Sequence, residues 1–219
     1  MVPIISGMKK PAFTRDDVED LKMEPGYNGF FDLNIYSLRH RKFTGEWAPE
    51  IRREVFERGH AVAVLPYDPG RDTVLLIEQF RPGAYFALNS PWFGEDSSPW
   101  VYEGVAGIID PGEQPEDVAY REAIEETGTP LTDLMLVSHY LVSPGGTTES
   151  VFVYIGCADL SNVDGYHGVE HEGEDIRPFT VPLREAYDAI EEGLVNNAMT
   201  IVALQWLMLN KDKVLAKWS

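Results

Sequence analysis

Glutamates are concentrated in the segment GIIDPGEQPEDVAYREAIEETG, residues 107–128. Glu122 and Glu126 are four residues apart, so on a helix with about 100° per residue their carboxylates stand one turn above each other. Like charges at this spacing destabilise an isolated helix, and Arg121 is the only base in the segment. Carboxylates that converge on one point are the ligands that a hard divalent cation binds. From charge alone, the pattern fits either a cation site or a solvated acidic helix face.

A helix from Pro115 to Thr127 is expected to position these side chains. Proline at the first helical position, acidic residues in the first turn and Gly128 after the last turn are typical helix boundaries. One arc of this helix is expected to pack on a sheet, and it consists of Ala119, Tyr120, Ala123, Ile124 and Thr127. The opposite arc carries Arg121, Glu122, Glu125 and Glu126, with Val118 among them.

The net charge of the whole chain limits the classes of molecule that it is expected to bind. With 36 acidic and 18 basic residues the net charge is −18, which repels nucleic acid and anionic membranes, so neither is expected as a partner. A diphosphate would be repelled as well, unless bound divalent cations supply positive charge. For most of the acidic residues, solubility is a sufficient explanation.

The remaining composition indicates a protein of the cytoplasm. Cys157 is the only cysteine, which excludes an internal disulfide framework and a multi-cysteine metal site. The chain contains no run of about 18 apolar residues, and its first residues do not resemble a secretory signal.

The elements around the acidic helix follow an α+β pattern, with strands flanked by few helices and no regular βαβ alternation. Residues 1–25 are expected to be a leader with one short helix. Strands are predicted at 30–43 and 50–59 around a turn at Thr44-Gly45, at 60–67 and 73–81 as a hairpin, and at 101–109, 134–142 and 150–158. Further helices are predicted at 184–193 and 198–212, and irregular segments at 86–99 and 161–175.

The acidic segment resembles the Nudix box, whose pattern is Gly, five residues, Glu, seven residues, Arg-Glu, two residues, Glu-Glu, one residue, Gly. The chain matches it at Gly107, Glu113, Arg121, Glu122, Glu125, Glu126 and Gly128, and departs from it at Thr129, where the family usually has an apolar residue. Seven fixed positions in 22 residues make a specific signal. The resemblance implies a Nudix-type α/β/α sandwich with a mixed sheet (residues 58–219), preceded by an N-terminal strand arm (residues 1–57).

The resemblance also implies a metal site. Glu122 and Glu126 are expected to be the principal Mg²⁺ ligands, with further oxygens from Glu125, Glu174 and the carbonyl of Ala106. Two or three Mg²⁺ ions per site are implied, with Mn²⁺ as a substitute. Arg121 is expected to orient the glutamates.

A second motif is similar to the ADP-ribose pyrophosphatase branch of the family. It is SPGGTTE, residues 143–149, with Pro144 fifteen residues beyond Thr129, the last position of the box. The implied reaction is hydrolysis of ADP-ribose to AMP and ribose 5-phosphate, with Glu172 of the acidic loop as general base.

The same branch implies a homodimer with shared active sites. Phe30 and Arg53 of the partner subunit would hold the adenine. Arg81 and Glu149 would face the terminal ribose, the phosphates or the adenine edge, and Gly145 and Gly146 would allow close approach of the backbone to the ribose. Taken without the resemblance, Phe30 fits an ordinary core position, Arg53 an ordinary surface position and the loop acids a solvated loop.

Three alternatives stay open at this point. The substrate could be another nucleoside diphosphate sugar or a dinucleotide, because segment 86–99 is longer than in the familiar bacterial enzymes and precedes the catalytic strand. A non-catalytic ADP-ribose sensor is a second alternative, although such proteins typically lose box glutamates and all four are present here. An acidic cation-buffering or assembly protein is the third, and it leaves the fixed glycines unexplained.

Overall fold

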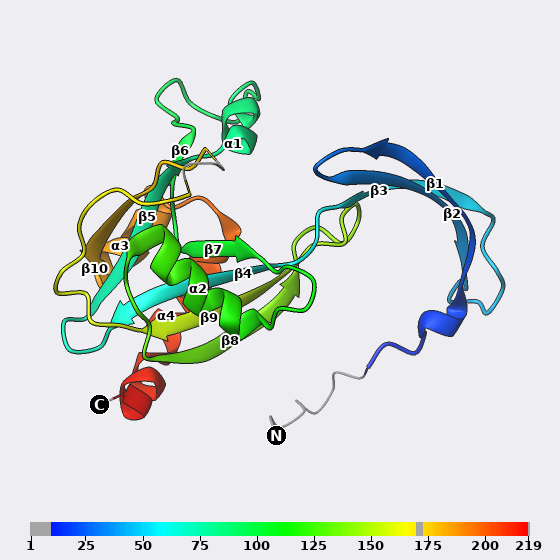
Figure 1. Ribbon diagram of the computed structural model, residues 1–219. Coiled ribbons are helices and arrows are strands. Elements are labelled where there is room, and N and C mark those ends of the chain that lie inside the picture. The colour runs from blue at the N-terminus through cyan, green and yellow to red at the C-terminus, as the bar shows by residue number, and fades with distance from the viewer. Residues whose placement is uncertain (1–9, 170–172, 219) are drawn as a thin grey trace. The chain divides into compact units, whose positions relative to one another are not determined.

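The computed structural model describes residues 10–169 and 173–218, which fall into two compact units (Figure 1). The first unit contains the described residues up to Arg58 together with Ser143–Glu149, and the second contains Gly59–Val142 and the described residues from Ser150 onward. Sequence analysis assigns 143–149 to the domain at 58–219. The segment groups with the arm because Phe56 forms two backbone hydrogen bonds with it, to Gly146 (2.9 Å) and Thr148 (3.2 Å).

The first unit is a three-stranded antiparallel sheet in the order β1-β2-β3. Its elements are a short 3₁₀-helix (Arg15–Asp17), β1 (Val18–Asn28), β2 (Asp32–His40) and β3 (Ile51–Glu57). The predicted strands at 30–43 and 50–59 are confirmed as β2 and β3. The leader expected at 1–25 is wrong from residue 18 onward, because pairing with β2 along its whole length draws this polar segment into the sheet.

This arm has no hydrophobic core of its own. None of its described residues 10–58 is buried, and several of its large apolar side chains are exposed: Val18, Leu21, Met23, Tyr27, Phe30, Phe43 and Phe56. A small sheet of this kind gains little stability from its own apolar contacts. We therefore expect another surface to cover the arm.

The second unit is built on a mixed seven-stranded sheet in the order β10-β5-β4-β9-β8, with β6 paired to β5 and β7 paired to β4. Its strands are β4 (Ala61–Asp68), β5 (Thr73–Phe80), β6 (Trp100–Glu103), β7 (Val105–Ile108), β8 (Asp133–Leu141), β9 (Ser150–Cys157) and β10 (Arg177–Pro182). Among these described strands, β4 and β9 pair in parallel and the other pairs are antiparallel.

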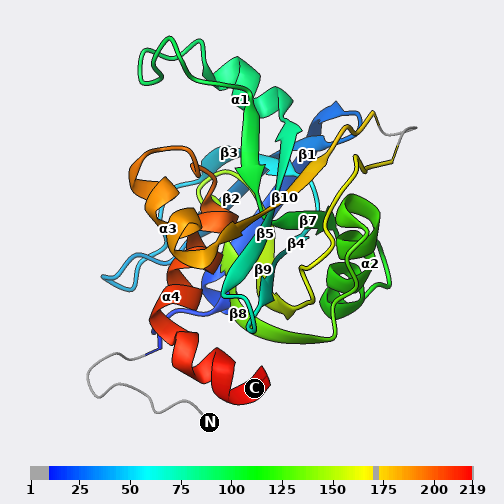
Figure 2. The same ribbon diagram turned by 90° about the vertical axis from the view of Figure 1, so that its left-hand side faces the viewer.

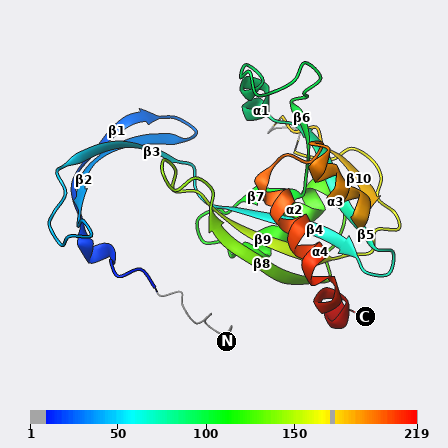
Figure 3. The same cartoon turned by 180° about the vertical axis from the view of Figure 1, so that it is seen from behind.

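Helices cover both faces of this sheet. Helix α2 (Pro115–Thr127) lies on one face, and α3 (Leu183–Glu191) and α4 (Ala198–Trp218) cover the other (Figures 1 and 3). Along β4 the side chains alternate accordingly: Val62 and Val64 pack in the cluster of α2, whereas Ala63 and Leu65 pack in the cluster of α3 and α4. The predicted α/β/α sandwich with a mixed sheet is confirmed.

The strand predicted at 101–109 is interrupted. Gly104 separates β6 from β7, and its N–H donates to the Thr200 hydroxyl of α4 at 2.8 Å. A Cβ at this position would lie 3.1 Å from the Val64 carbonyl oxygen. At Gly104 the chain therefore stops pairing with β5 and begins pairing with β4, and only glycine fits this position well.

Two further elements differ from the predicted pattern. Helix α1 (Pro82–Ala87) begins at a proline just before the segment predicted to be irregular, and β10 follows the acidic loop. Helix α4 extends beyond its predicted end, past a non-helical residue at Asn210. Neither α4 nor any other described helix is both long enough and apolar enough to cross a membrane.

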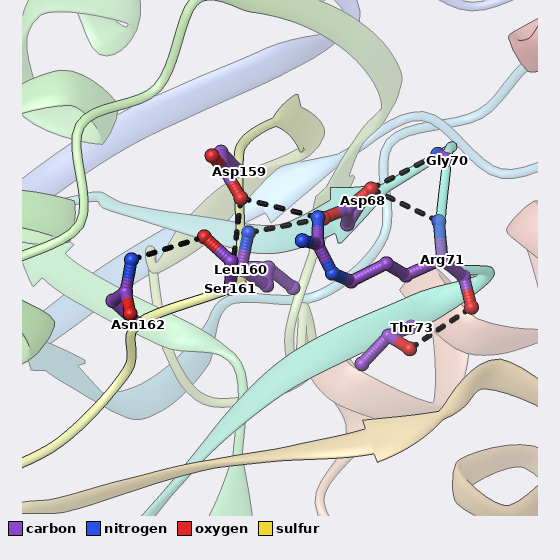
Figure 4. A network of polar contacts seen from close by, with 8 residues as sticks. All are labelled: Asp68, Gly70, Arg71, Thr73, Asp159, Leu160, Ser161 and Asn162. Carbon is purple, nitrogen blue, oxygen red and sulfur yellow. Dashed lines mark hydrogen bonds and ion pairs between the residues drawn. The ribbon is translucent and has the colours of Figure 1, made fainter.

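A polar network fixes the start of the loop at 161–175 (Figure 4). The buried carboxylate of Asp68 accepts hydrogen bonds from the backbone N–H groups of Gly70 (2.9 Å), Arg71 (3.1 Å) and Leu160 (3.1 Å). Burial raises the pKa of Asp68, but these bonds and the Arg71 guanidinium outweigh it, so the pKa lies below its ordinary value. The hairpin turn and the beginning of the loop are thereby held together.

Candidate active site

Helix α2 buries Glu126 and half-buries Glu122, whereas Glu125 is exposed. Residues 118, 119, 122, 123 and 126 occupy one arc of about 140°. The side chains of Val118, Ala119 and Ala123 are fully buried, and Glu126, near the centre of this arc, is 3% exposed. The predicted packing face is confirmed for Ala119, Ala123 and Thr127, which are buried, and wrong for Tyr120 and Ile124, which are 38% and 48% exposed. The helix is turned so that Val118 and Glu126 face the sheet in their place.

Glu126 points at strand β7. Its Oε2 accepts a hydrogen bond from the backbone N–H of Ala106 at 3.1 Å. Burial raises the pKa of Glu126 well above its ordinary value, although the bond from Ala106 opposes this, and the charge of Glu122 raises it further. Arg81 is close enough for its charge to lower the pKa of Glu126.

Glu122 lies beside Gly107 of the same strand. A Cβ at Gly107 would overlap the Glu122 side chain, so the missing side chain makes room for the carboxylate. Burial raises the pKa of Glu122 to about 7, against the opposing effect of Arg121, and the charges of Glu125 and Glu174 raise it as well. The glycine of the box therefore has a steric role toward one of its glutamates.

Arg121 contacts three of the four glutamates of the box. Its guanidinium donates to Glu122 (2.7 Å), to Glu125 (3.0 Å) and through two nitrogens to Glu113 (both 3.2 Å). Burial alone would lower the pKa of Arg121, but the three carboxylates raise it. Glu113 also accepts from the N–H of Asp110, and both interactions lower the pKa of Glu113. The positive charge of Arg121 is thus shared by the carboxylates of Glu113, Glu122 and Glu125.

The chemistry of these groups fits a divalent cation. Glu122 and Glu126 supply carboxylate oxygens on one helix face beside the backbone of Ala106, and oxygen donors of this kind suit Mg²⁺. Within the described ranges, no three Asp, Glu, His or Cys side chains are placed so that they could hold one metal ion together. Glu125 instead bonds to Arg121, and Glu174 accepts from the N–H of Val169 at 3.0 Å. The pair Glu122 and Glu126 is therefore the part of the predicted ligand set that lies against β7.

Sequence analysis missed the partner of Arg81. The Arg81 Nε donates to the Glu103 carboxylate at 2.7 Å, and Gln79 donates to the same oxygen at 3.3 Å. Glu103 is 5% exposed, and it is paired because a buried carboxylate needs compensation. A single acidic residue within the apolar strand WVYEGVAG is a signal that could have marked Glu103 as a buried, paired carboxylate, but it does not identify the partner.

Other predicted substrate residues belong to the first unit. Phe30 is 87% exposed and packs its edge against Phe31, with ring centroids 4.7 Å apart. Arg53 lies on β3, where its guanidinium donates to the Arg52 carbonyl at 2.8 Å. Glu149 pairs with Arg58 at 3.2 Å.

Gly145 and Gly146 belong to a turn of the first unit, closed by a bond of 3.0 Å from the Gly146 N–H to the Ser143 carbonyl. No atom lies within 4 Å of a Cβ built on either glycine. The turn therefore leaves open space beside its backbone, and the structure itself assigns these glycines no packing role.

The acidic loop is attached to the end of α2. His167 and Ile176 exchange two backbone hydrogen bonds (2.9 and 3.0 Å), and the Gly168 N–H reaches the Glu125 carbonyl at 3.4 Å. The charge of Glu174 raises the pKa of both Glu122 and Glu126. Glu172, the predicted base, lies outside the described residues.

Comparison with known proteins assigns the chain to a family. The model of the NUDIX domain matches residues 57–199. An ADP-ribose pyrophosphatase of Escherichia coli is 45% identical over 95% of this chain and 96% of its own length, and one of Haemophilus influenzae is 37% identical over 94% and 93%. A GDP-mannose pyrophosphatase of Cronobacter sakazakii is 35% identical over 72% of this chain and 78% of its own.

A solved structure shares the fold. It is described as an ADP compounds hydrolase and superposes with a TM-score of 0.66 at 20% identity, covering 92% of this chain and 98% of that one. Together with the glutamates that α2 buries against Ala106 and Gly107, these matches show that the chain belongs to the Nudix family.

Proposed function

We propose that this protein hydrolyses the diphosphate bond of ADP-ribose with metal-activated water, releasing AMP and ribose 5-phosphate. The observation that carries the proposal is that buried Glu126 and half-buried Glu122 lie against β7, in a chain 45% identical to an ADP-ribose pyrophosphatase over 95% of its length. Two neighbouring desolvated carboxylates destabilise a fold unless a cation or a proton compensates them. Such a pair is therefore better explained by a cation site than by a solvated helix face.

Glu122 and Glu126 would hold Mg²⁺, with Glu125, Glu174 and the carbonyl of Ala106 as the further donors that the resemblance implies. When bound, the ions would neutralise the diphosphate and lower the pKa of the attacking water. Two or three ions per site, and Mn²⁺ as a substitute, remain predictions.

The chain's own residues have separable roles in this proposal. Arg121 is a positioning residue, because it holds Glu122 and Glu125 and is itself fixed by Glu113. Glu103 fixes the guanidinium of Arg81, which can then face the substrate phosphates. Glu172 would accept the proton of the attacking water, as the resemblance implies. A cytoplasmic location also remains a prediction.

We expect turnover of ADP-ribose to depend on divalent metal. With Mg²⁺ in excess, AMP and ribose 5-phosphate should appear in equal amounts, and a chelator should abolish their release because the buried carboxylates then lack their cation. Chromatographic measurement of both products tests this, with Mn²⁺ as a second metal and GDP-mannose as a second substrate. If ADP-ribose stays intact in saturating Mg²⁺, the proposed function is contradicted. If GDP-mannose is hydrolysed faster than ADP-ribose, the substrate is a different nucleoside diphosphate sugar.

We further propose a homodimer in which the arm of each subunit completes the site of its partner. The arm lacks a buried residue among its described positions 10–58 and exposes Phe30 almost completely. Exposed apolar surface of this extent is typical of an interface. Phe30 and Arg53 would then hold the adenine in the partner's site.

Complementation between two inactive variants tests this shared site. Arg53→Ala would damage the adenine contact, and Glu126→Gln the metal site. If each site uses the arm of its partner, a mixed dimer contains one intact site, and an equal mixture of exchanged subunits should recover about a quarter of wild-type activity. Activity no higher than the sum of the two separate variants, in a mixture shown to contain mixed dimers, would contradict sharing.

A further inference from the structure

The acidic loop has a stem, residues 164–169 and 174–176, that lies against the C-terminal end of α2 (Figure 2). Within the stem, His167 and Ile176 form an antiparallel bridge. The Ile176 side chain is fully buried in the hydrophobic cluster that α2 forms with the sheet. The stem therefore holds the two sides of the loop together beside the helix that carries the box.

The His167 imidazole packs directly on Gly128, the residue that ends α2. Gly128 has a φ of 65°, in the left-handed region that favours glycine. A Cβ built on Gly128 would lie only 2.9 Å from Cε1 of the His167 ring. The final glycine of the box thus meets two requirements, because it turns the chain out of the helix and leaves room for the ring.

A hydrogen bond sets the orientation of this ring. The Nε2 of His167 lies 2.9 Å from the carbonyl oxygen of Asp164. A carbonyl oxygen only accepts, so Nε2 carries the proton and donates. The next residue of the stem is attached to the last turn of α2, because the Gly168 N–H donates to the Glu125 carbonyl at 3.4 Å. The ring and this bond together connect the stem to the end of the helix.

The stem also fixes a carboxylate of the loop. The Val169 N–H donates to Oε2 of Glu174 at 3.0 Å, and the Glu174 N–H donates to the Val169 carbonyl at 3.4 Å. Gly168, with a φ of 103°, lies so close that a Cβ on it would come within 2.7 Å of the Glu174 Cβ. Glu174 therefore packs on the residue that follows His167, and its position depends on where the stem is held.

We propose that His167 is a positioning residue, whose ring on Gly128 fixes the acidic loop relative to the helix that carries Glu122 and Glu126. The inference rests on the proposed function, because that function requires carboxylates of this loop to act beside the glutamates of α2. Without the ring, fewer contacts would attach the loop to α2. The loop would then adopt more arrangements and reach the reactive one less often.

Hydrogen exchange tests this anchor without reference to turnover. In His167→Ala the backbone amides of the stem should exchange several-fold faster than in the wild type, because the contact with Gly128 is lost. Amides in the middle of α2 should be unchanged. Tyr166→Ala is the matched control, since Tyr166 is the exposed neighbour of His167 on the same stem, and it should leave the exchange of the stem as in the wild type.

Steady-state kinetics tests the positioning role. His167→Ala should lower kcat for ADP-ribose about tenfold and leave KM and the unfolding temperature in chelator almost unchanged, because the placement of the loop matters in the transition state. His167→Gln keeps an N–H donor with a reach similar to that of Nε2, so it should recover most of kcat. Tyr166→Ala should have the kcat of the wild type.

The two measurements separate this inference from the proposed function. A wild type that does not hydrolyse ADP-ribose contradicts the proposed function. If the wild type hydrolyses it, but His167→Ala keeps either the wild-type kcat or the wild-type exchange of the stem, the positioning role alone is overturned. A loss of kcat that merely follows a lowered unfolding temperature would assign His167 to the stability of the fold, which also overturns that role.

Discussion

Replacing Glu126 by glutamine should lower kcat for ADP-ribose by about 100- to 10,000-fold, since metal ions contribute several kcal/mol to the transition state and each 1.4 kcal/mol is a factor of ten. The substitution keeps the size of the side chain and an oxygen that can accept from the Ala106 N–H. It replaces the other carboxylate oxygen by an amide NH2 group, which cannot bind a cation, and removes the negative charge that the cation requires. Steady-state kinetics at saturating Mg²⁺ measures the loss.

The same variant should not be less stable than the wild type. Burial raises the pKa of Glu126 above its unfolded value near 4.5, so the folded state binds the proton more tightly than the unfolded state. Without metal, this group therefore contributes stability below its unfolded pKa and loses that contribution as pH rises through its folded pKa. In chelator at pH 8, Glu126→Gln should unfold at the same or a higher temperature than the wild type.

Asp117 provides the matched control. It lies on the exposed side of the same helix, so Asp117→Asn removes an equal charge without touching the buried arc. We expect wild-type kcat from this control. Near-wild-type turnover by Glu126→Gln would contradict the metal site, and a lowered unfolding temperature in chelator would show that its activity loss reports on folding instead.

Local signals in the sequence were sufficient to predict the boundaries of α2. Pro115 at the first turn and Gly128 with φ of 65° at the end define the helix in sequence and in structure alike. Its orientation was not predictable from hydrophobicity. Tyr120 and Ile124 suggested a packing face, whereas the structure buries Glu126 and half-buries Glu122, because the arc that faces the sheet serves the site as well as the core.

Apart from helix α1, the features that were missed depend on non-local pairing. Strand β10 contains two prolines in six residues and is specified by its register with β5, which pairs Phe179 with Leu76. The ion pair of Arg81 and Glu103 likewise requires β5 and β6 to lie side by side. Neither contact is encoded by a local pattern, since the partners are more than twenty residues apart.

Replacing Gly107 by alanine should weaken Mg²⁺ binding by about 10- to 100-fold, the usual cost of disturbing the surroundings of a metal ligand. The new methyl group would occupy the place of the Glu122 side chain. Gly107 does not have a positive φ, so alanine fits its backbone conformation. The overlap involves a flexible side chain, which can move away at little cost to the fold. Affinity and kcat/KM should therefore fall while the unfolding temperature in chelator changes little.

A double-mutant cycle decides whether Gly107 acts through Glu122. If its only role is to make room for that carboxylate, Gly107→Ala should cost almost nothing further once Glu122→Gln has already removed the ligand. Independent roles would instead make the two losses in Mg²⁺ affinity multiply. Calorimetric titration of Mg²⁺ into the four proteins of the cycle gives the coupling directly. If the two losses in Mg²⁺ affinity multiply, or if Gly107→Ala alone leaves the affinity unchanged, Gly107 is required for the backbone conformation and not to make room for Glu122.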